Sequence, residues 1–199
     1  MKRYAVDIVL LPPDDLISKS IELNRKLILK NTPKIKLNRK DCLPHISLSM
    51  GVLNESEREL FIEKLKIRAQ DHKPFSLKST GIYTVEIPGG EKVAGIAIEK
   101  SKELYTLHTD MMEMSEKYLT NNAIIDDVYT PPPAEEVTLH FINNYPDKSA
   151  YENFHPHITL GVGEMEDPEF TPEFTVTDLA LFHLGNYCTC RKPLAKYKI

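Results

Sequence analysis

The sequence lacks several features that would point to particular classes of protein. It has no tryptophan, only three cysteines, and no hydrophobic run approaching the roughly 20 residues of a membrane-spanning helix. The odd cysteine count, in a chain of 199 residues that can bury an ordinary core, argues against a disulfide framework. The chain is therefore expected to be a soluble, globular, cytoplasmic monomer without a membrane partner.

An excess of basic residues is also missing. The 25 Lys and Arg are outnumbered by 29 Asp and Glu, which gives a formal net charge of −4. Proteins that hold a long duplex neutralise many phosphates with basic side chains, and this composition does not favour that mode of binding. We therefore expect no long duplex as a partner, and a nucleic-acid substrate would be a nucleotide or a short RNA terminus.

The apolar residues predict alternating strands and helices. Strands are expected over residues 4–11, 43–50, 75–87, 93–98, 137–142 and 155–162, followed by a closing hairpin of 174–184 and 187–197 that turns at Gly185-Asn186. Helices are expected over residues 14–30, from 54 past 65, and from Ser101 to about 120. Residues 121–154 are interrupted by prolines and are the least regular part. This order predicts an α+β fold with mostly antiparallel strands.

One short motif occurs twice in the chain. Residues 44–51 read Pro-His-Ile-Ser-Leu-Ser-Met-Gly, and residues 156–163 read Pro-His-Ile-Thr-Leu-Gly-Val-Gly. The two histidines, His45 and His157, are 112 residues apart, and each copy follows a strand and a helix. A repeat at this distance predicts two similar lobes related by a pseudo-two-fold axis. We expect a single domain over residues 1–199, built of two interleaved lobes with one motif each.

The motif places its polar residues on one face of a strand. Because side chains alternate between faces, His45 and Ser47 share one face while the aliphatic residues share the other. His157 and Thr159 repeat this arrangement. With the aliphatic faces buried, each copy presents an imidazole and a hydroxyl, about 7 Å apart along the strand. Two facing lobes would then form a cleft with two histidines and two hydroxyls.

These four side chains suit the cleavage of a phosphodiester. In-line displacement needs a base for the attacking oxygen and an acid for the departing oxygen, on opposite sides of phosphorus. Histidine serves either role near neutral pH. The hydroxyls of Ser47 and Thr159 can donate hydrogen bonds to the oxygens on which negative charge accumulates. The scheme requires neither a metal nor a cofactor.

The motif also has a purely structural explanation. A single histidine in an apolar strand is more often a packed, hydrogen-bonded residue than a catalyst. Packing alone, however, does not require an imidazole at the same phase of both copies. The remaining structural explanation is a duplication that kept the motif for folding.

At these residues the sequence resembles the two-histidine (2H) phosphoesterase superfamily, which includes 2′-5′ RNA ligase-like proteins and cyclic nucleotide phosphodiesterases. The family signature is two copies of His-x-(Ser/Thr)-x with apolar x, and both copies here match it. The resemblance implies a bilobal fold with the motifs in a central cleft. It also implies metal-independent cleavage of 2′,3′-cyclic or 2′-linked phosphodiesters by His45 and His157, with Ser47 and Thr159 on the phosphate. The spacing between the motifs is longer than in compact members, with the excess in residues 121–154.

Other residues are candidates for the cleft. His155 precedes the second catalytic histidine by two residues and would either join it on a metal, orient it or line the rim. Asp7, a charged residue within the first strand, faces either the cleft or solvent. The aromatic residues available to stack on a base are Tyr83, Tyr129 and Phe141, although a core position is commoner for each.

Two further groups carry a weaker signal. Cys188-Thr189-Cys190 has no partner pair of cysteines, so a zinc site is not expected. Lys34, Lys36, Arg39 and Lys40 form a basic stretch before the first motif. That stretch either attracts a phosphate tail or is a solvated loop, which is the commoner case.

Two alternative functions stay open at this level. The first is a module that binds RNA ends or nucleotides without turnover. The second is an enzyme for another small phosphodiester, such as a cyclic ADP-ribose phosphate. Calorimetric binding of a 2′,3′-cyclic nucleotide without product would identify the binding module. The most informative experiment is a panel of cyclic and 2′-5′ linked substrates, assayed with and without a chelator.

Overall fold

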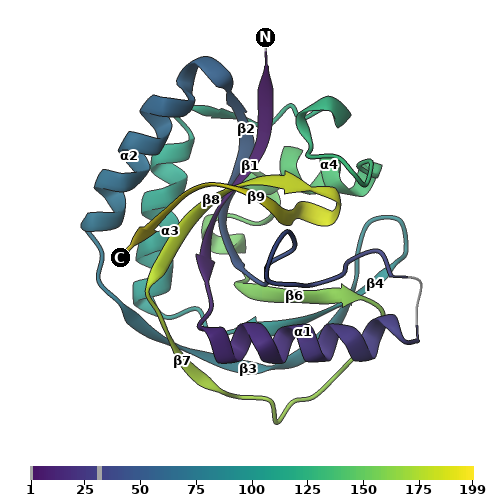
Figure 1. Cartoon of the computed structure of the whole chain (residues 1–199). Helices are drawn as coiled ribbons and strands as arrows, with labels where there is room; N and C mark the ends of the chain where they lie inside the picture. The colour runs from purple at the N-terminus through teal and green to yellow at the C-terminus, as the bar shows by residue number, and fades with distance from the viewer. Residues whose placement is uncertain (1, 31–32) are drawn as a thin grey trace.

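The computed structural model describes residues 2–30 and 33–199 as two antiparallel sheets with helices packed on them (Figure 1). The first sheet has the strand order β5-β2-β1-β8-β9, and the second has the order β6-β4-β3-β7. The strands are β1 (Arg3–Leu11), β2 (Ile46–Asn54), β3 (Phe75–Glu86), β4 (Lys92–Ile98), β5 (Leu119–Thr120), β6 (His157–Val162), β7 (Glu173–Val176), β8 (Asp178–Gly185) and β9 (Thr189–Lys198). The α-helices are α1 (Asp14–Ile28), α2 (Arg58–Gln70), α3 (Lys102–Ser115), α4 (Glu136–Asn143) and α5 (Tyr145–Lys148). Short 3-10 helices are η1 (Glu55–Glu57), η2 (Ile125–Asp127), η3 (Tyr151–Asn153) and η4 (Asn186–Cys188).

The two longest predicted helices begin where the sequence indicates. Helix α1 starts directly after Pro13 and carries Asp14 and Asp15 in its first turn, where negative charge favours the helix dipole. Helix α3 is capped by Ser101, whose hydroxyl accepts a hydrogen bond from the Leu104 N–H at 3.2 Å. Among the described residues, no helix combines the length and the apolar character needed to cross a membrane.

Two of the helices, α1 and α3, pack on the sheet to which their preceding strand does not belong, and we call them the crossed helices. Helix α1 follows β1 of the first sheet in sequence, yet it packs against β6 of the second sheet (Figure 1). Helix α3 follows β4 of the second sheet, yet it packs against β2 of the first. Helix α2 lies beside α3 and packs on β9. Each lobe is therefore covered by a helix whose preceding strand belongs to the other sheet.

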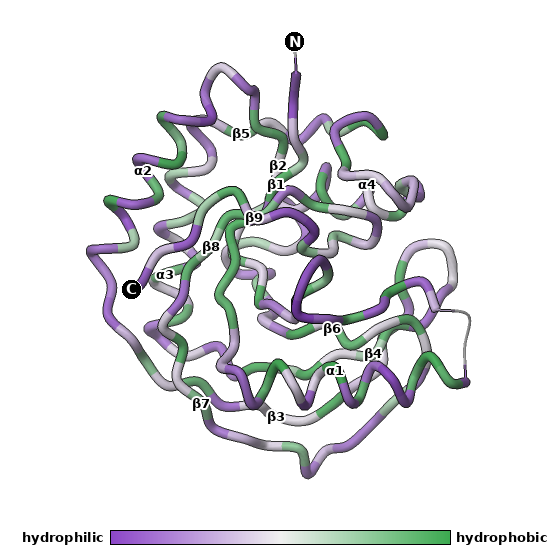
Figure 2. Tube along the Cα trace, viewed as in Figure 1, coloured by the Kyte–Doolittle hydropathy of each residue, from purple (hydrophilic) through white to green (hydrophobic). Residues whose placement is uncertain are grey.

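One cluster of buried side chains joins the two sheets. It includes Ile46 and Leu48 from the first motif and Ile158 and Leu160 from the second. Burying a side chain of this size contributes about 1.5–3 kcal/mol relative to leaving it exposed. Hydrophobic residues run along β8 in the middle of the molecule, whereas helix α2 alternates between hydrophobic and hydrophilic positions (Figure 2). We propose that residues 1–199 fold as a single domain, because a shared core cannot be divided without exposing it.

The strand predicted over residues 137–142 is wrong, because these residues belong to helix α4. Thr138 and Ile142 are the buried residues of the helix, and their spacing of four is that of one helical face. Glu136 in the first turn favours the helix through the backbone dipole. In so short and apolar a segment, the sequence does not show which residues are buried, so it does not distinguish a helix from a strand.

The closing hairpin is shorter than predicted, because its first residues form a separate strand. Strands β8 and β9 pair with each other around η4, as predicted. Phe174 and Val176 instead lie in β7, which pairs with β3 in the second sheet. The chain therefore passes from the second sheet to the first between β7 and β8. Both sheets are completed by residues from the C-terminal part of the chain.

Candidate active site

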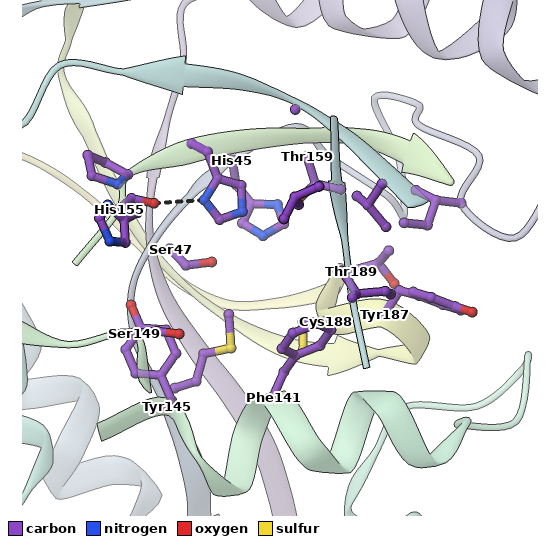
Figure 3. Close-up of a pocket in the computed structure, with 18 of the residues that line it drawn as sticks. His45, Ser47, Phe141, Tyr145, Ser149, His155, Thr159, Tyr187, Cys188 and Thr189 are labelled. Atoms are coloured by element: carbon purple, nitrogen blue, oxygen red, sulfur yellow. Dashed lines mark hydrogen bonds between the residues drawn. The ribbon is translucent and has the colours of Figure 1, made fainter. Parts of the chain in front are cut away.

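A pocket of about 230 Å³ is lined by residues of both sheets. Both copies of the motif contribute to it, through His45, Ser47, His157 and Thr159. Figure 3 shows His45 and Thr159 across the pocket from Phe141, which comes from helix α4. The sheet arrangement thus brings together the four polar side chains that the repeat singles out.

Strand alternation explains how the motif residues reach the pocket. The aliphatic residues of the motifs are fully buried on the opposite side of their strands: Ile46, Leu48, Ile158 and Leu160. The histidines and hydroxyl residues between them are partly exposed. Burial of the aliphatic residues in the core therefore fixes the direction of the polar ones.

The two motif histidines are held in the same way. His45 Nδ1 lies 2.8 Å from the carbonyl oxygen of Leu43, and His157 Nδ1 lies 2.8 Å from the carbonyl oxygen of His155. Because a carbonyl oxygen only accepts, Nδ1 of each ring carries the proton and donates it. Each imidazole consequently leaves Nε2 for chemistry in the pocket, as a lone pair in the neutral ring and as an N–H in the charged ring.

Burial shifts the protonation of both rings. The pKa of His45 is lowered to about 4, chiefly by desolvation and to a lesser degree by the charge of His157, while the hydrogen bond to the Leu43 carbonyl acts to raise it. The pKa of His157 is also lowered, chiefly by desolvation and to a lesser degree by the charge of His155. In the protein alone His45 is therefore neutral at pH 7, and burial acts in the same direction on His157.

Asp7 lies beneath the first motif and is fully buried, so the solvent-facing alternative is wrong. Ser47 Oγ forms a hydrogen bond with Asp7 Oδ2 at 2.6 Å, and His45 Nε2 is 3.8 Å from the same oxygen. Burial raises the pKa of Asp7 well above its usual range, while the hydrogen bonds from Ser47 and from the backbone of Ser49 and Leu48 lower it less. Burial therefore favours the protonated form of the carboxyl group that contacts the first motif.

Each motif strand contains a β-bulge at the same residue of the repeat. In β2, Ser47 pairs with Val9 and Ser49 with Ile8, so that Leu48 is the extra residue. Strand β6 has its extra residue at Leu160, between the Thr159 and Gly161 pairs with β4. A bulge re-aims neighbouring side chains and leaves a backbone group without its ladder partner. The bulges are therefore part of how the pocket side chains are oriented.

Buried polar side chains from the crossed helices hold the two bulges. His108 Nδ1 of α3 donates to the Leu48 carbonyl oxygen at 2.8 Å, and Asn24 Nδ2 of α1 donates to the Leu160 carbonyl oxygen at 2.7 Å. The close approach of Asn24 requires Gly161, because a Cβ at that residue would lie 2.9 Å from the Asn24 amide nitrogen. We call Asn24 and His108 the bulge anchors.

The bulge anchors also hold two segments that line the pocket. The amide of Asn24 donates to Ile35 O at 3.0 Å and accepts from the Leu37 N–H at 3.0 Å. His108 Nε2 accepts from the Tyr151 N–H at 2.9 Å, and its ring stacks on Phe154. Neither anchor is among the site residues predicted from the sequence. The available signal was a polar residue within the apolar face of each helix.

The remaining cleft candidates are divided by the structure. Those that line the pocket are Tyr83, His155 and Phe141. The Tyr83 ring meets the His157 ring edge to face, with centroids 6.4 Å apart. Tyr129 is not among the residues that line the pocket and instead packs edge to face on His183, with centroids 5.4 Å apart. A partly exposed aromatic ring in the pocket is therefore offered by Tyr83 or Phe141 rather than by Tyr129.

Two of the four basic residues predicted as a stretch before the first motif form ion pairs. Lys34 forms ion pairs with Glu91 and Glu135, both at 2.8 Å, and Arg39 pairs at 2.8 Å with an aspartate at the start of α1. These contacts make the stretch a structural tie between the β3–β4 connection and the segment before α4. A lysine that the sequence pattern does not indicate, Lys148, lines the pocket instead.

The described residues also bear on the metal and zinc hypotheses. Within residues 2–30 and 33–199, no three His, Cys, Asp or Glu side chains are grouped so that they could hold a metal ion. The cysteines of the chain, Cys42, Cys188 and Cys190, are free and buried. Burial raises the pKa of Cys42 to about 11, which keeps this thiol protonated at neutral pH.

Comparisons with solved structures match the fold over the whole chain. E. coli LigT complexed with 3′-AMP aligns with a TM-score of 0.57 at 15% identity, covering 100% of this chain and 99% of LigT. The Thermus thermophilus protein TT0787 aligns with a TM-score of 0.60 at 18% identity, over 98% and 97% of the two chains. A protein described as a phosphoesterase aligns with a TM-score of 0.53 at 15% identity over 98% of both chains. No protein-family model and no curated protein sequence matches this chain.

These likenesses define the fold. The chain has the α+β fold of the LigT-like two-histidine phosphoesterases, as the doubled motif predicts. The neighbours are consistent with the two-histidine phosphoesterase superfamily, which the sequence resembles. At identities of 12–18% the likeness establishes the fold, whereas the reaction depends on the side chains in the pocket.

Proposed function

We propose that the protein is a metal-independent phosphoesterase that cleaves, or reversibly forms, a 2′,3′-cyclic or 2′-5′ phosphodiester of a nucleotide or RNA end. The observation that carries the proposal is the matched pair of imidazoles in one pocket. His45 and His157 are each held through Nδ1 by the carbonyl oxygen two residues earlier. One imidazole takes the proton from the attacking oxygen, and the other gives a proton to the departing oxygen.

The substrate itself supplies the charge that the acid needs. In the protein alone, burial lowers the pKa of both imidazoles. A phosphate anion next to an imidazole favours the protonated form and raises its pKa again. One histidine therefore takes up a proton as the phosphate binds and becomes the acid. The other stays neutral and acts as the base, and the two exchange roles in the reverse reaction.

The motif hydroxyls are assigned to the phosphate oxygens. Ser47→Ala and Thr159→Ala are each expected to lower kcat by about 10-fold to 100-fold, because each removes one hydrogen-bond donor from the charge that builds up at phosphorus. Steady-state kinetics on the best substrate measures the effect. The matched controls Ser76→Ala and Thr175→Ala remove exposed hydroxyls from β3 and β7 and should leave kcat unchanged. Wild-type kcat in both motif variants would remove the hydroxyls from the mechanism.

A nucleotide or a short RNA end suits the pocket. Ile35 and Leu37 supply an apolar wall for a base, Tyr83 supplies a ring, and Lys148 supplies a positive charge for a phosphate. The same fold is seen in LigT complexed with 3′-AMP, with ATP and with phosphate, which supports a nucleotide substrate. The net charge of −4 favours a single small phosphodiester over a long polyanion.

The proposal is tested with a substrate panel assayed with and without EDTA. The panel contains 2′,3′-cyclic mononucleotides, 2′-5′ linked dinucleotides, RNA ends bearing a cyclic phosphate and a cyclic ADP-ribose phosphate. Turnover of a cyclic or 2′-5′ linked nucleotide that persists in EDTA is the expected result. Loss of turnover in EDTA would favour a metal at His155 and His157. Calorimetric binding of a cyclic nucleotide without product would indicate a binding module, and turnover confined to the ADP-ribose compound would change the substrate class.

A further inference from the structure

The pseudo-two-fold symmetry of the pocket is broken at one buried residue. Counted from the motif histidines, Met50 and Val162 are equivalent, and their partners across the ladder are Asp7 in β1 and Val93 in β4. The two lobes thus carry an acid and an aliphatic residue at the same place. The motif serine has a carboxyl group beside it, and the motif threonine has none at the equivalent position.

The environment of the Asp7 side chain favours a neutral carboxyl group over a carboxylate. It is fully buried, its Oδ2 is 2.6 Å from the Ser47 hydroxyl, and its Oδ1 has no hydrogen-bond partner among the described residues. A buried carboxylate with an unpartnered oxygen is far more costly than a neutral carboxyl group in the same place. The local geometry therefore favours a proton on Asp7.

The titratable groups around Asp7 do not reverse this preference. They are His45, which directly precedes β2, Tyr145 in α5, Cys188 in η4 and Cys190 in β9. The tyrosine and the two cysteines are anionic when ionised, so they repel a carboxylate. His45 is the cationic possibility, and desolvation lowers its pKa to about 4, so that it is neutral at pH 7. In the substrate-free protein, Asp7 consequently has no cation to pair with at neutral pH among the described residues.

We infer that Asp7 is a proton-bearing positioning residue, whose carboxylic acid donates to Ser47 Oγ and so turns the Ser47 hydroxyl proton toward the substrate phosphate. This inference rests on the proposed function. A serine hydroxyl has a single proton. When Asp7 is ionised, its Oδ2 accepts a hydrogen bond from that proton. The Ser47 oxygen then offers only lone pairs to an anion. When Asp7 is neutral, its own proton occupies the 2.6 Å contact and the serine proton is free to bind a phosphoryl oxygen.

The inference predicts that activity falls at alkaline pH because Asp7, beside the first motif, ionises. As pH rises through the pKa of Asp7, the carboxylate forms and repels the bound phosphate. The Ser47 hydroxyl then donates its hydrogen bond to the carboxylate instead of the phosphate, so activity should fall. Thr159 has Val93 at the position equivalent to Asp7, so it lacks this dependence. The two hydroxyls that look equivalent in sequence therefore differ in their response to pH.

The activity test uses two replacements of Asp7 with opposite expectations. Asp7→Val copies the other lobe, removes the donor and is expected to lower kcat by about 10-fold to 100-fold, as Ser47→Ala does. Asp7→Asn keeps a donor for Ser47 Oγ but cannot ionise, so it should restore kcat to within about threefold of wild type and abolish the alkaline limb of the pH profile. Asp7→Val combined with Ser47→Ala should be no worse than Ser47→Ala alone, because Asp7 acts through Ser47. A loss in Asp7→Asn equal to that in Asp7→Val would overturn the inference, since it would show that the charge is required.

A stability measurement tests the proton on Asp7 without any substrate. A group with a raised pKa in the folded state costs stability as pH rises from its unfolded pKa, near 4, to its folded pKa, because only the unfolded chain then releases the proton freely. The melting temperature of Asp7→Asn minus that of wild type should therefore increase steadily with pH above 4. A constant difference would overturn the inference. Because this readout needs no catalysis, an inactive protein with the expected difference would refute the proposed reaction and leave the buried proton in place.

Discussion

Replacing His45 or His157 by alanine is expected to lower kcat at least 100-fold, the scale of a lost general acid or base. Both rings are held through Nδ1 and have Nε2 as their free nitrogen. The double variant is expected to lose little more than either single variant. The losses in kcat from removing two groups that act in the same step are not additive, because the step is already impaired when one group is missing.

The matched control for the histidine prediction is His140→Ala. His140 is exposed on α4 and is not among the residues that line the pocket. Its removal should leave kcat and KM unchanged on the same substrate. Circular dichroism and the melting temperature establish that the motif variants are folded before their rates are compared. Full activity of a folded His45→Ala or His157→Ala protein would eliminate two-histidine catalysis.

The second large effect is expected at Asn24, one of the bulge anchors. Asn24→Leu keeps the approximate size of the side chain but removes its hydrogen bonds to Leu160, Ile35 and Leu37. Each buried backbone group left without a partner costs about 1–3 kcal/mol, so the free energy of unfolding should fall by about 3 kcal/mol or more. Equilibrium unfolding in urea measures this difference. We also expect lower activity, because the same hydrogen bonds hold the second motif and a pocket wall.

The control for Asn24 lies on the same helix. Arg25→Ala removes an exposed side chain next to Asn24 in sequence and should change the free energy of unfolding by less than about 0.5 kcal/mol. The structure predicts a parallel loss in His108→Leu, since His108 holds the other bulge from the other crossed helix. A change below about 1 kcal/mol in Asn24→Leu would contradict the assigned role, because it would mean that the freed backbone groups find other partners.

The features predicted correctly from sequence are those set by local patterns. Alternation within the motif predicted that His45 and Ser47 would leave one face of β2 while their aliphatic neighbours entered the core. Helical spacing and the Ser101 cap located α3, and the turn at Gly185-Asn186 located the β8–β9 pair. Each of these depends on residues within about ten positions of each other.

The features missed depend on contacts between distant segments. Residues 137–142 are apolar enough for a strand, and only their packing against η4 and β2 makes them a helix. The side on which Asp7 lies could not be decided from β1 alone, because it depends on Ser47 in the neighbouring strand. The bulge anchors act across 136 residues in one case and 60 in the other, so neither has a local signature.

The crossed helices determine how the pocket can respond to a ligand. Helix α1 is hydrogen-bonded to the strand of the second motif and helix α3 to the strand of the first, so each motif is held by its own helix. The positions of the two imidazoles are therefore set when the chain folds, so that in the proposed reaction the entropy of aligning them is lost during folding rather than at each turnover.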